Sequence, residues 1–204
     1  MTKLFNDVRD FNRACDVRMR VTPGWVPDED IELALRLVDE EANELLAAIQ
    51  DRDMVETADA VADSLYVLAG FALRLGVARI FTPDLLPPPT PQSFGPPSWD
   101  AYGILPELLN QISVLHERLR EAVLTRNLNA TDTTLHSLMY SYSTVARGMG
   151  IPLREVWDEV QRSNMAKVVD GKVVRDPHTG KVLKPEGWTA PDIAAVLDDY
   201  GWAA

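Results

Sequence analysis

Residues 38–70 read VDEEANELLAAIQDRDMVETADAVADSLYVLAG and carry nine acidic side chains but a single basic one. Apolar residues recur three and four positions apart on both sides of QDRD (50–53), a spacing that predicts two helices. The short turn between them makes the two helices antiparallel neighbours. Glu41 lies between Val38 and Leu45 on the apolar stripe of the first helix. The sequence therefore predicts that a carboxylate faces the neighbouring helix.

Helical spacing continues over most of the chain, and no segment has the pattern of a parallel sheet, so we expect an all-α fold. Gly76 and Gly150 are natural C-caps, and Asp28 is a natural N-cap. A hairpin turning at DPHTGK (176–181) is expected before the last helix. The predicted helices cover about 3–15, 28–49, 54–75, 103–125, 130–149 and 152–167, with a short one from Pro191.

Residues 78–102 separate two predicted helical pairs and are rich in proline. The stretch 82–100 alone holds seven of the chain's fourteen prolines, which is typical of an extended linker. We expect residues 1–204 to form one all-α domain, in which 103–150 is an inserted helical hairpin.

The second helical pair repeats the first when Ile151 is aligned with Val77, an alignment that we call the repeat register. It also pairs Leu45 with Leu119, and it ends both helical pairs on a glycine. The acids are not repeated, because the positions of Glu41, Glu44, Asp59 and Asp63 correspond to Leu115, Arg118, Thr133 and Ser137. An internal duplication and a chance likeness of two helical hairpins both stay open.

Composition excludes several classes of function. The net charge is −11 and no Lys/Arg run occurs, so we expect no binding to nucleic acid. The longest apolar run is too short to span a bilayer, and residues 1–16 lack the apolar core of a signal peptide, so no membrane partner is expected. Cys15 cannot form an internal disulfide, which fits a reducing cytoplasm, and it is expected to be a small buried residue.

The acids form two groups on the neighbouring helices of the opening stretch. At helical spacing, each group shares a face of its helix: Glu40, Glu41 and Glu44 on the first, and Glu56, Asp59 and Asp63 on the second. Carboxylates crowded in a poorly solvated groove repel one another, so either some take up protons or a hard dication neutralises them. Oxygen ligands favour Mg²⁺ or Mn²⁺ over zinc. The alternative is a solvated acidic surface.

Three segments carry a resemblance to a known family. EEANE (40–44) resembles the E-E-x-x-E motif of the MazG-like all-α nucleoside triphosphate pyrophosphatases, and DAVADSLYVLAGFALRLGV (59–77) resembles the helix that follows it. VWDEVQRSNMAKVVDG and GKVLKPEGWTAPDI, within 156–193, resemble the C-terminal part of one branch of that family, which includes dimeric dUTPases and phosphoribosyl-ATP pyrophosphohydrolases. The resemblance covers about residues 3–77 and 152–196.

The resemblance implies a four-helix-type bundle, here enlarged by the inserted hairpin, and Mg²⁺-dependent (or Mn²⁺-dependent) hydrolysis of a nucleoside triphosphate to the monophosphate and pyrophosphate. By position, it implies that Glu41, Glu44 and Asp63 are metal ligands. Glu40 becomes a further ligand or the base, and Glu40 and Glu41 are the candidate catalytic residues. Separately, we expect a homo-oligomer, a dimer or tetramer, because apolar helix faces usually exceed what one such bundle buries.

The chain departs from the family motif on the second helix. The family has E-x-x-D there, and if Asp63 is its aspartate, the glutamate position is occupied by Ala60. Asp59 lies one helical turn before Asp63 and can supply the missing oxygen ligand. In the other register, Glu56 and Asp59 form the motif themselves. We prefer the first register, because Asp63 directly precedes the matching SLYVLAG segment.

A triphosphate also needs cations that hold its phosphates. The resemblance favours Asn164 and Lys167, followed by Lys184, and Arg175 lies in the same tail. The alternative is that the lysines merely complement a helix C-terminus. The aromatic residues Trp25, Tyr66 and Trp188 are candidates for stacking on a base, although a core position is the commoner role of such residues.

Three hypotheses follow. The first is a nucleotide pyrophosphatase that controls a nucleotide pool, with dUTPase-, dCTPase- or phosphoribosyl-ATP-type specificity open. The second is an inactive helical module that binds a nucleotide or a protein, supported by Ala60 at a ligand position. The third concerns architecture: the inserted hairpin 103–150 stands in for the helices of a partner subunit.

Overall fold

The computed structural model describes the chain except residues 1, 79–83, 87–96, 177–181 and 203–204. Seven helices and one short hairpin make up the described part, which confirms the all-α class. The elements are α1 (Lys3–Ala14), α2 (Asp28–Asp51), α3 (Met54–Leu75), α4 (Leu105–Leu124), α5 (Leu128–Met149), α6 (Leu153–Met165), β1 (Val168–Val169), β2 (Lys172–Val173) and α7 (Ile193–Asp199). No helix in these described segments is long and apolar enough to cross a membrane.

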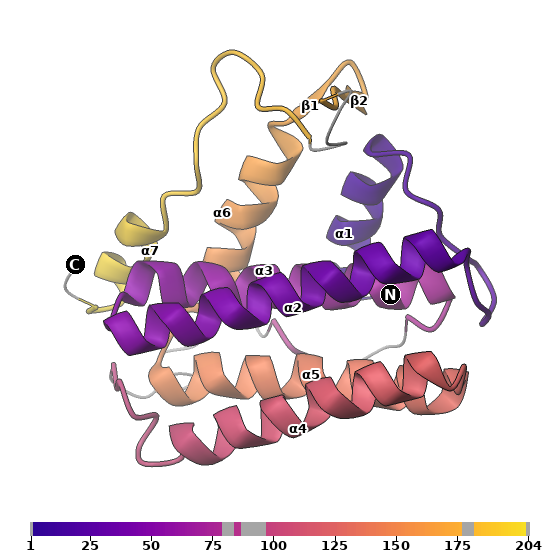
Figure 1. Cartoon of the computed structure of the whole chain (residues 1–204). Helices are drawn as coiled ribbons and strands as arrows, with labels where there is room; N and C mark the ends of the chain where they lie inside the picture. Colours follow the sequence, from indigo (N-terminus) through magenta and orange to yellow (C-terminus); the bar gives the residue numbers. More distant parts are fainter. Residues whose placement is uncertain (1, 79–83, 87–96, 177–181, 203–204) are drawn as a thin grey trace.

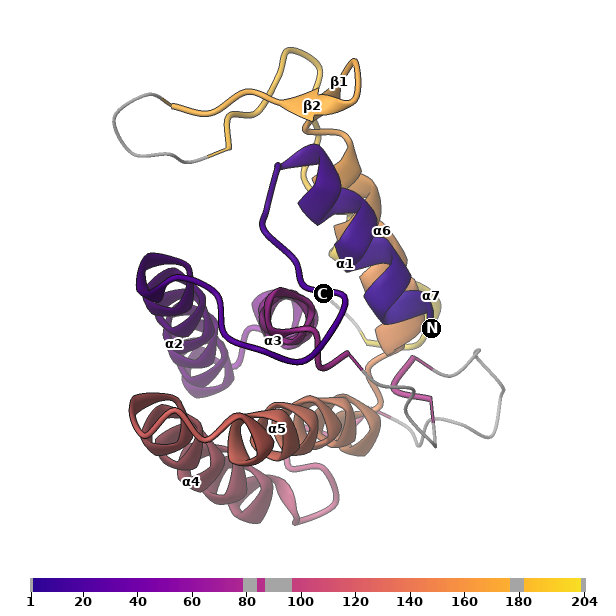
Figure 2. The same ribbon diagram turned by 90° about the vertical axis from the view of Figure 1, so that its right-hand side faces the viewer.

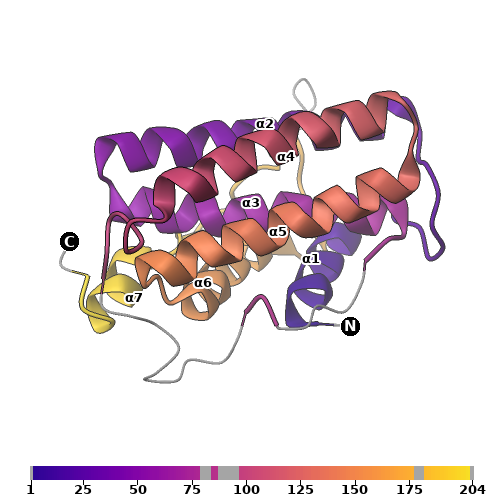
Figure 3. The same ribbon diagram turned by 90° about the horizontal axis from the view of Figure 1, so that it is seen from below.

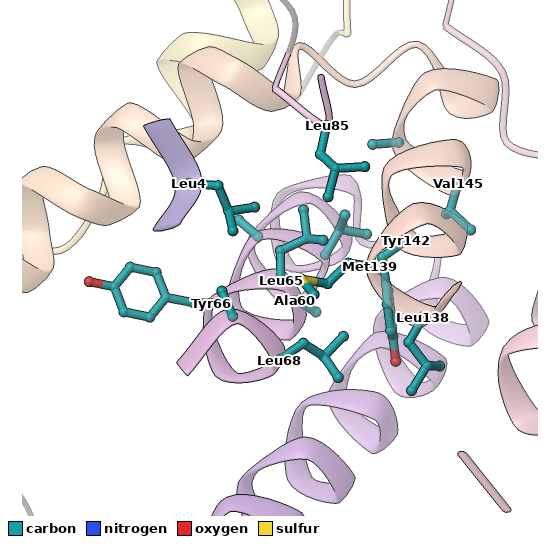
Figure 4. Close-up of a cluster of buried hydrophobic side chains, with 14 of the residues drawn as sticks. Leu4, Ala60, Leu65, Tyr66, Leu68, Leu85, Leu138, Met139, Tyr142 and Val145 are labelled. Atoms are coloured by element: carbon teal, nitrogen blue, oxygen red, sulfur yellow. The ribbon is translucent and has the colours of Figure 1, made fainter. Parts of the chain in front are cut away.

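Two helical hairpins lie against each other, and α3 is the central helix. Figures 1 and 3 show the α2–α3 pair beside the α4–α5 pair, with α3 packed on α5. Figure 2 shows α1 and α6 on the opposite side of α3. The apolar core forms where these layers meet, and Figure 4 shows Leu65 and Leu68 of α3 near Leu4, Met139 and Tyr142. Burial of α3 on several sides explains why its apolar residues are not confined to one stripe.

The helices α2 and α3 begin in different ways. Asp53 caps α3, because its carboxylate accepts a hydrogen bond from the backbone N–H of Glu56 at 3.0 Å. The prediction of Asp28 as the cap of α2 is wrong, since Pro27 takes the N-cap position and Asp28 is already helical. Asp28 lies instead in the acidic first turn, where a negative charge meets the positive end of the helix dipole.

The turns of the two hairpins match in the repeat register. The backbone N–H of Asp53 donates to the carbonyl of Ala48 at 3.0 Å, and that of Asn127 donates to Ala122 at 2.9 Å. Asn127 caps α5 as Asp53 caps α3, with its side chain 3.1 Å from the backbone nitrogen of residue 130. This cap starts α5 two residues earlier than predicted, and α4 is shorter than predicted by two residues at its start and one at its end.

The ends of α3 and α5 match in the same register. The predicted C-caps are confirmed, with Gly76 at φ 69° and Gly150 at φ 79°. The residue after each glycine donates its N–H back to the helix, at 2.9 Å to Ala72 and 2.8 Å to Ala146. A Cβ on Gly76 would lie 2.3 Å from the carbonyl oxygen of Thr22, so close approach of the chain also requires glycine there.

Part of the segment predicted as an extended linker packs against the core. Leu85 and Leu86 are buried, and Ser143 donates to the carbonyl of Leu85 at 3.0 Å. Arg154 of α6 donates to the carbonyl of Leu86 at 2.8 Å. The segment therefore contributes apolar residues to the domain, while the rest of the proline-rich stretch, 87–96, lies outside the described residues.

The C-terminal region contains a hairpin that was not predicted. Strands β1 and β2 pair antiparallel, with Val168 opposite Val173, and the turn at Asp170–Gly171 has positive φ at both residues. An antiparallel bridge between Arg175 and Val182 follows, which fits the predicted turn at 176–181. The tip of that predicted turn lies outside the described residues.

Candidate functional site

Acidic side chains from α2 and α3 meet where the two antiparallel helices pack. Glu41, predicted to face α3, is only partly exposed. Its pKa is raised to about 8, first by burial and then by the negative charges of Asp63, Glu44 and Asp59. The charge of Asp63 is the largest of these electrostatic contributions. The structure therefore brings the predicted carboxylates of both helices within reach of one another's charge. We call Glu41, Glu44, Asp59 and Asp63 the acid cluster.

The two acids of α3 in the acid cluster also bind protons more tightly than usual. The pKa of Asp63 is raised to about 7, first by burial and then by the charge of Asp59. Burial raises the pKa of Asp59 to about 6, aided by the charges of Glu56 and Glu44. Without a cation, the acid cluster is therefore only partly ionised at neutral pH.

The remaining predicted acids lie at the edge of the cluster. Glu40 is exposed, and its carboxylate lies 3.7 Å from the guanidinium of Arg36, although its charge still acts on Glu41. Glu56 is exposed in the first turn of α3 and acts on Asp59. Both side chains have access to solvent, so Glu40 is better placed to contact a water molecule than to hold a buried ion.

Ala60 is buried in the apolar core. It is 5% exposed and lies near Leu65 and Leu68 in Figure 4. A glutamate at this position of the present backbone would start inside an apolar cluster, where an ionised carboxylate is costly. Asp59, one residue earlier, is only partly buried, and the charges of Glu56 and Glu44 act on it. Its role as the replacement oxygen ligand stays a prediction.

Lys167 supplies positive charge opposite the acids, just beyond the end of α6. Its charge lowers the pKa values of both Asp63 and Asp59, against the effect of burial. Burial lowers the pKa of Lys167 itself, and the charge of Asp63 opposes that effect. The Lys167 ammonium donates to the side-chain oxygen of Asn164 at 2.8 Å. Two of the predicted substrate-binding residues are thus joined to each other beside the acid cluster.

A hydrogen-bond network behind Lys167 was not predicted from the sequence. Tyr66 of α3 donates its hydroxyl to the Gln161 side chain at 2.8 Å, and Asn164 also hydrogen-bonds to Tyr66. The Tyr66 ring stacks on Trp157, with 5.3 Å between centroids, so Tyr66 is a core residue rather than a free stacking surface. The sequence did contain a signal for this network, because the spacing of Trp157, Gln161 and Asn164 places them on one face of α6.

The other predicted substrate-side residues lie in the C-terminal tail. Lys184 lies over the ring of Trp188, with 4.0 Å between its ammonium and the centroid, and Lys167 lies 5.8 Å from the same centroid. The Trp188 indole donates to the carbonyl of Ser163 at 2.9 Å, which holds the tail against α6. Arg175 donates to the carbonyl of Cys15, at the end of α1.

Trp25 is separate from this tail. The Arg126 guanidinium lies over the Trp25 ring at 4.9 Å, near the turn between α4 and α5. Trp25 therefore belongs to the contact between the two helical hairpins.

The acid cluster has the donor chemistry of a hard-cation site. One oxygen of Glu41, Oε2, is buried without a hydrogen-bond partner, which is costly unless something else satisfies it. All four donors are carboxylates, the ligands that Mg²⁺ and Mn²⁺ prefer. Within the described parts of the chain, no three acidic, histidine or cysteine side chains are already arranged around one ion position. The residues fit a hard dication in kind, and binding requires their side chains to converge.

Comparisons with known proteins agree with this chemistry. Residues 8–81, which include the whole acid cluster, match the family model described as phosphoribosyl-ATP pyrophosphohydrolase. The chain is also 26% identical, over 217 aligned positions, to an uncharacterized protein of Acanthamoeba polyphaga mimivirus. That alignment covers 83% of this chain and 84% of the viral protein. No solved structure matches the chain.

Proposed function

We propose that the protein hydrolyses a nucleoside triphosphate to the monophosphate and pyrophosphate. The premise is that residues 8–81 belong to the phosphoribosyl-ATP pyrophosphohydrolase family, within the MazG-like all-α nucleoside triphosphate pyrophosphatases. The observation that carries the proposal is the acid cluster itself. Glu41, Asp59 and Asp63 are partly buried between α2 and α3, and the charge of the exposed Glu44 acts on all three. The charge of Lys167 acts on Asp59 and Asp63 with the opposite sign. Such crowding is costly unless a cation compensates it.

Glu41, Glu44, Asp59 and Asp63 would hold Mg²⁺ or Mn²⁺. When bound, the metal supplies charge neutralisation on phosphate oxygens and a lower pKa for a coordinated water. The chain's own contribution is to hold these oxygens on two helices fixed by a short turn and a capped helix start. Asp59 takes the place of the glutamate that the family has where this chain has Ala60.

Cationic and polar side chains would hold the phosphates from the opposite side. Lys167 and Asn164, already joined by a hydrogen bond, are placed to contact phosphate oxygens beside the acids. The exposed Lys184 provides a second cation on the same side of the tail. Arg175 is a more remote candidate, because its guanidinium contacts the end of α1.

Glu40 is the candidate base of this reaction. Its carboxylate is exposed beside Glu41, so it can accept a proton from a water that attacks phosphorus, while the bond to the pyrophosphate leaving group breaks. Glu41, as a ligand at the centre of the acid cluster, orients that water. The specificity of the reaction, for phosphoribosyl-ATP, dUTP, dCTP or another triphosphate, follows from contacts to the base and sugar. A homo-oligomer, dimer or tetramer, remains part of the prediction and is tested by analytical ultracentrifugation.

The test is pyrophosphate release from a panel of nucleoside triphosphates and phosphoribosyl-ATP with Mg²⁺. We expect release from at least one of them, and a loss of about 100-fold or more in Glu41→Gln, since a carboxylate at the centre of the cluster is removed. Glu32→Gln is the matched control, because Glu32 is an exposed acid on the same helix. Release from none of the substrates by a folded wild-type chain would leave the inactive helical module as the better hypothesis.

A further inference from the structure

A cavity of about 200 Å³ lies between α2, α4 and α5, apart from the acid cluster. On α2 it is lined by Asp39, Ala42, Asn43, Leu45 and Leu46. At 100° per residue, Asp39, Asn43 and Leu46 lie on a different face from Glu41 and Glu44, whereas Leu45 is one turn from Glu41. Most of the α2 lining therefore faces away from the acids. We call the cavity the seam pocket, because it lies where the two helical hairpins meet.

The α2 and α4 sides of the seam pocket correspond in the repeat register. The corresponding pairs are Asp39 with Ser113, Ala42 with His116, Asn43 with Glu117 and Leu46 with Arg120, and all eight residues line the pocket. The pocket is thus lined by corresponding positions of the two hairpins. Its lining differs between the two sides, since α4 has an imidazole and a guanidinium where α2 has a methyl group and an isobutyl group.

Polar groups of the seam pocket are held in place by contacts between helices. His116 is 7% exposed, and its Nε2 lies 2.9 Å from the hydroxyl of Tyr142 on α5. Arg120 donates to the carboxylate of Asp39 on α2 at 2.7 Å. Burial lowers the pKa of His116, so its ring is neutral near pH 7 and offers one donor and one acceptor. The pocket therefore presents positioned hydrogen-bonding groups.

The size and charge of the seam pocket restrict its ligand. Its volume is smaller than the roughly 300–1,000 Å³ typical of sites for drug-sized molecules, so it suits one ring system. Leu45, Leu109 and Ile112 provide apolar contact for the faces of a ring. Asp39 and Glu117 are both acidic, and Arg120 already pairs with Asp39, so a phosphate group is disfavoured.

We propose that the seam pocket is a second binding site, which takes a neutral heterocyclic ring of nucleobase size. Apolar walls contact the ring faces, and Asn43, Ser113 and the second ring nitrogen of His116 face its hydrogen-bonding edges, with Tyr142 fixing the His116 ring. The site needs no metal and no phosphate. It is independent of the proposed hydrolysis, so either proposal can fail without the other.

The experiment is ligand binding to the full chain in EDTA, with free cytosine, uracil, adenine and hypoxanthine as probes, measured by saturation-transfer and ¹H–¹⁵N NMR. Leu46→Trp places a larger side chain at the rim of the pocket. Val114→Trp on α4 is the matched control, because Leu46 and Val114 are similarly exposed, at 44% and 43%, and of the two only Leu46 lines the pocket. We expect at least one base to bind, with affinity reduced tenfold or more in Leu46→Trp and changed less than twofold in Val114→Trp and Glu41→Gln.

Three outcomes would overturn the proposal: none of the four bases binds, the two tryptophan variants bind alike, or Glu41→Gln abolishes binding and so places the base at the acid cluster. Amide shifts of the wild-type chain give an independent readout that needs no variant. They are expected at 39–46 and 109–120, and shifts confined to 56–67 would also contradict the seam pocket.

Discussion

The two helical hairpins have matching backbone turns and helix caps but different side chains at the positions of the acid cluster. In the repeat register, α2–α3 and α4–α5 have the same capped turn, the same glycine end and the same hydrogen bonds. At the four positions of the acid cluster the second hairpin has instead Leu115, Arg118, Thr133 and Ser137. The backbone geometry is therefore maintained by caps and apolar packing, and the acids are not needed to form it.

This difference supports the proposal that the second hairpin is a degenerate copy that occupies the place of a partner subunit. Its α5 packs on α3, and one ion pair across the interface is made by residues that the other copy does not have at the corresponding positions. Arg120 pairs with Asp39, whereas the corresponding residues of the other copy are Leu46 and Ser113. Two first hairpins would therefore lack this ion pair.

The largest expected effect comes from replacing an acid of the cluster, compared with the same replacement at the corresponding position of the second hairpin. Asp63→Asn should lower pyrophosphate release by about 100-fold or more, because it removes a charged ligand, which corresponds to about 2.7 kcal/mol. Ser137→Asn on α5 should leave the rate within about twofold. Steady-state kinetics at saturating Mg²⁺ compare the two variants. Equal losses in both would show that the second hairpin takes part in the chemistry.

Replacing the cation beside the acid cluster is expected to have a smaller effect. Lys167→Met keeps most of the side-chain volume and should lower kcat/KM by about tenfold or more, through loss of one phosphate contact. Lys172→Met is the control, since Lys172 is an exposed lysine of β2. If Lys167→Met has the same kcat/KM as the control, Lys167 merely complements the helix end.

The acid cluster should also make the metal-free protein less stable as pH rises. In the folded chain the pKa values of Glu41 and Asp63 are about 8 and about 7, against ordinary values of 4.5 and 3.8. The folded chain therefore keeps protons that the unfolded chain has lost, so the free energy of unfolding falls between about pH 4 and pH 8. In EDTA we expect Tm to drop by roughly 5 °C from pH 5 to pH 8.

The same thermal scans contain their own controls. Glu41→Gln should flatten the decrease, because its amide carries no charge at either pH, and Mg²⁺ should raise Tm at pH 8. A Tm that rises steadily over this range in EDTA, with no difference between wild type and Glu41→Gln, would contradict the crowding of the acids.

The smallest expected effect tests the likeness of the two hairpins. Asp53→Ala and Asn127→Ala each remove a side chain that caps a helix, so each should lower the free energy of unfolding by about 1 kcal/mol. Urea denaturation measures both. A large loss for one variant and none for the other would show that the corresponding turns do not play equal parts in stability.

The approximate positions of the helices and the approach of the acids on α2 and α3 could be predicted from the sequence, because both depend on spacing along one helix or across one short turn. Met54–Leu75 and the cap at Gly76 follow from apolar periodicity and one glycine. Glu41 and Asp63 share an electrostatic site because a short turn makes their helices neighbours. The choice of Asp59 to replace the ligand missing at Ala60 also rests on helical spacing and stays a prediction.

Contacts between distant segments could not be predicted in this way. The burial of Leu85 and Leu86 depends on α5 and α6, and prolines around them indicated only an extended chain. The bond between Tyr66 and Gln161 joins residues 95 positions apart. The cap at Asp28 was wrong because proline, with its fixed φ, fits the helix entry as well as a side-chain acceptor does.

The most direct test of a metal site on α2 and α3 is calorimetric titration of Mn²⁺ into the wild-type chain, Glu41→Gln, and Glu117→Gln, a control acid on α4. We predict saturable binding to the wild type, a loss of affinity of tenfold or more in Glu41→Gln, and no change in Glu117→Gln. Absence of saturable binding to the folded wild type, or equal affinity in all three proteins, would contradict a metal-dependent site at the acid cluster.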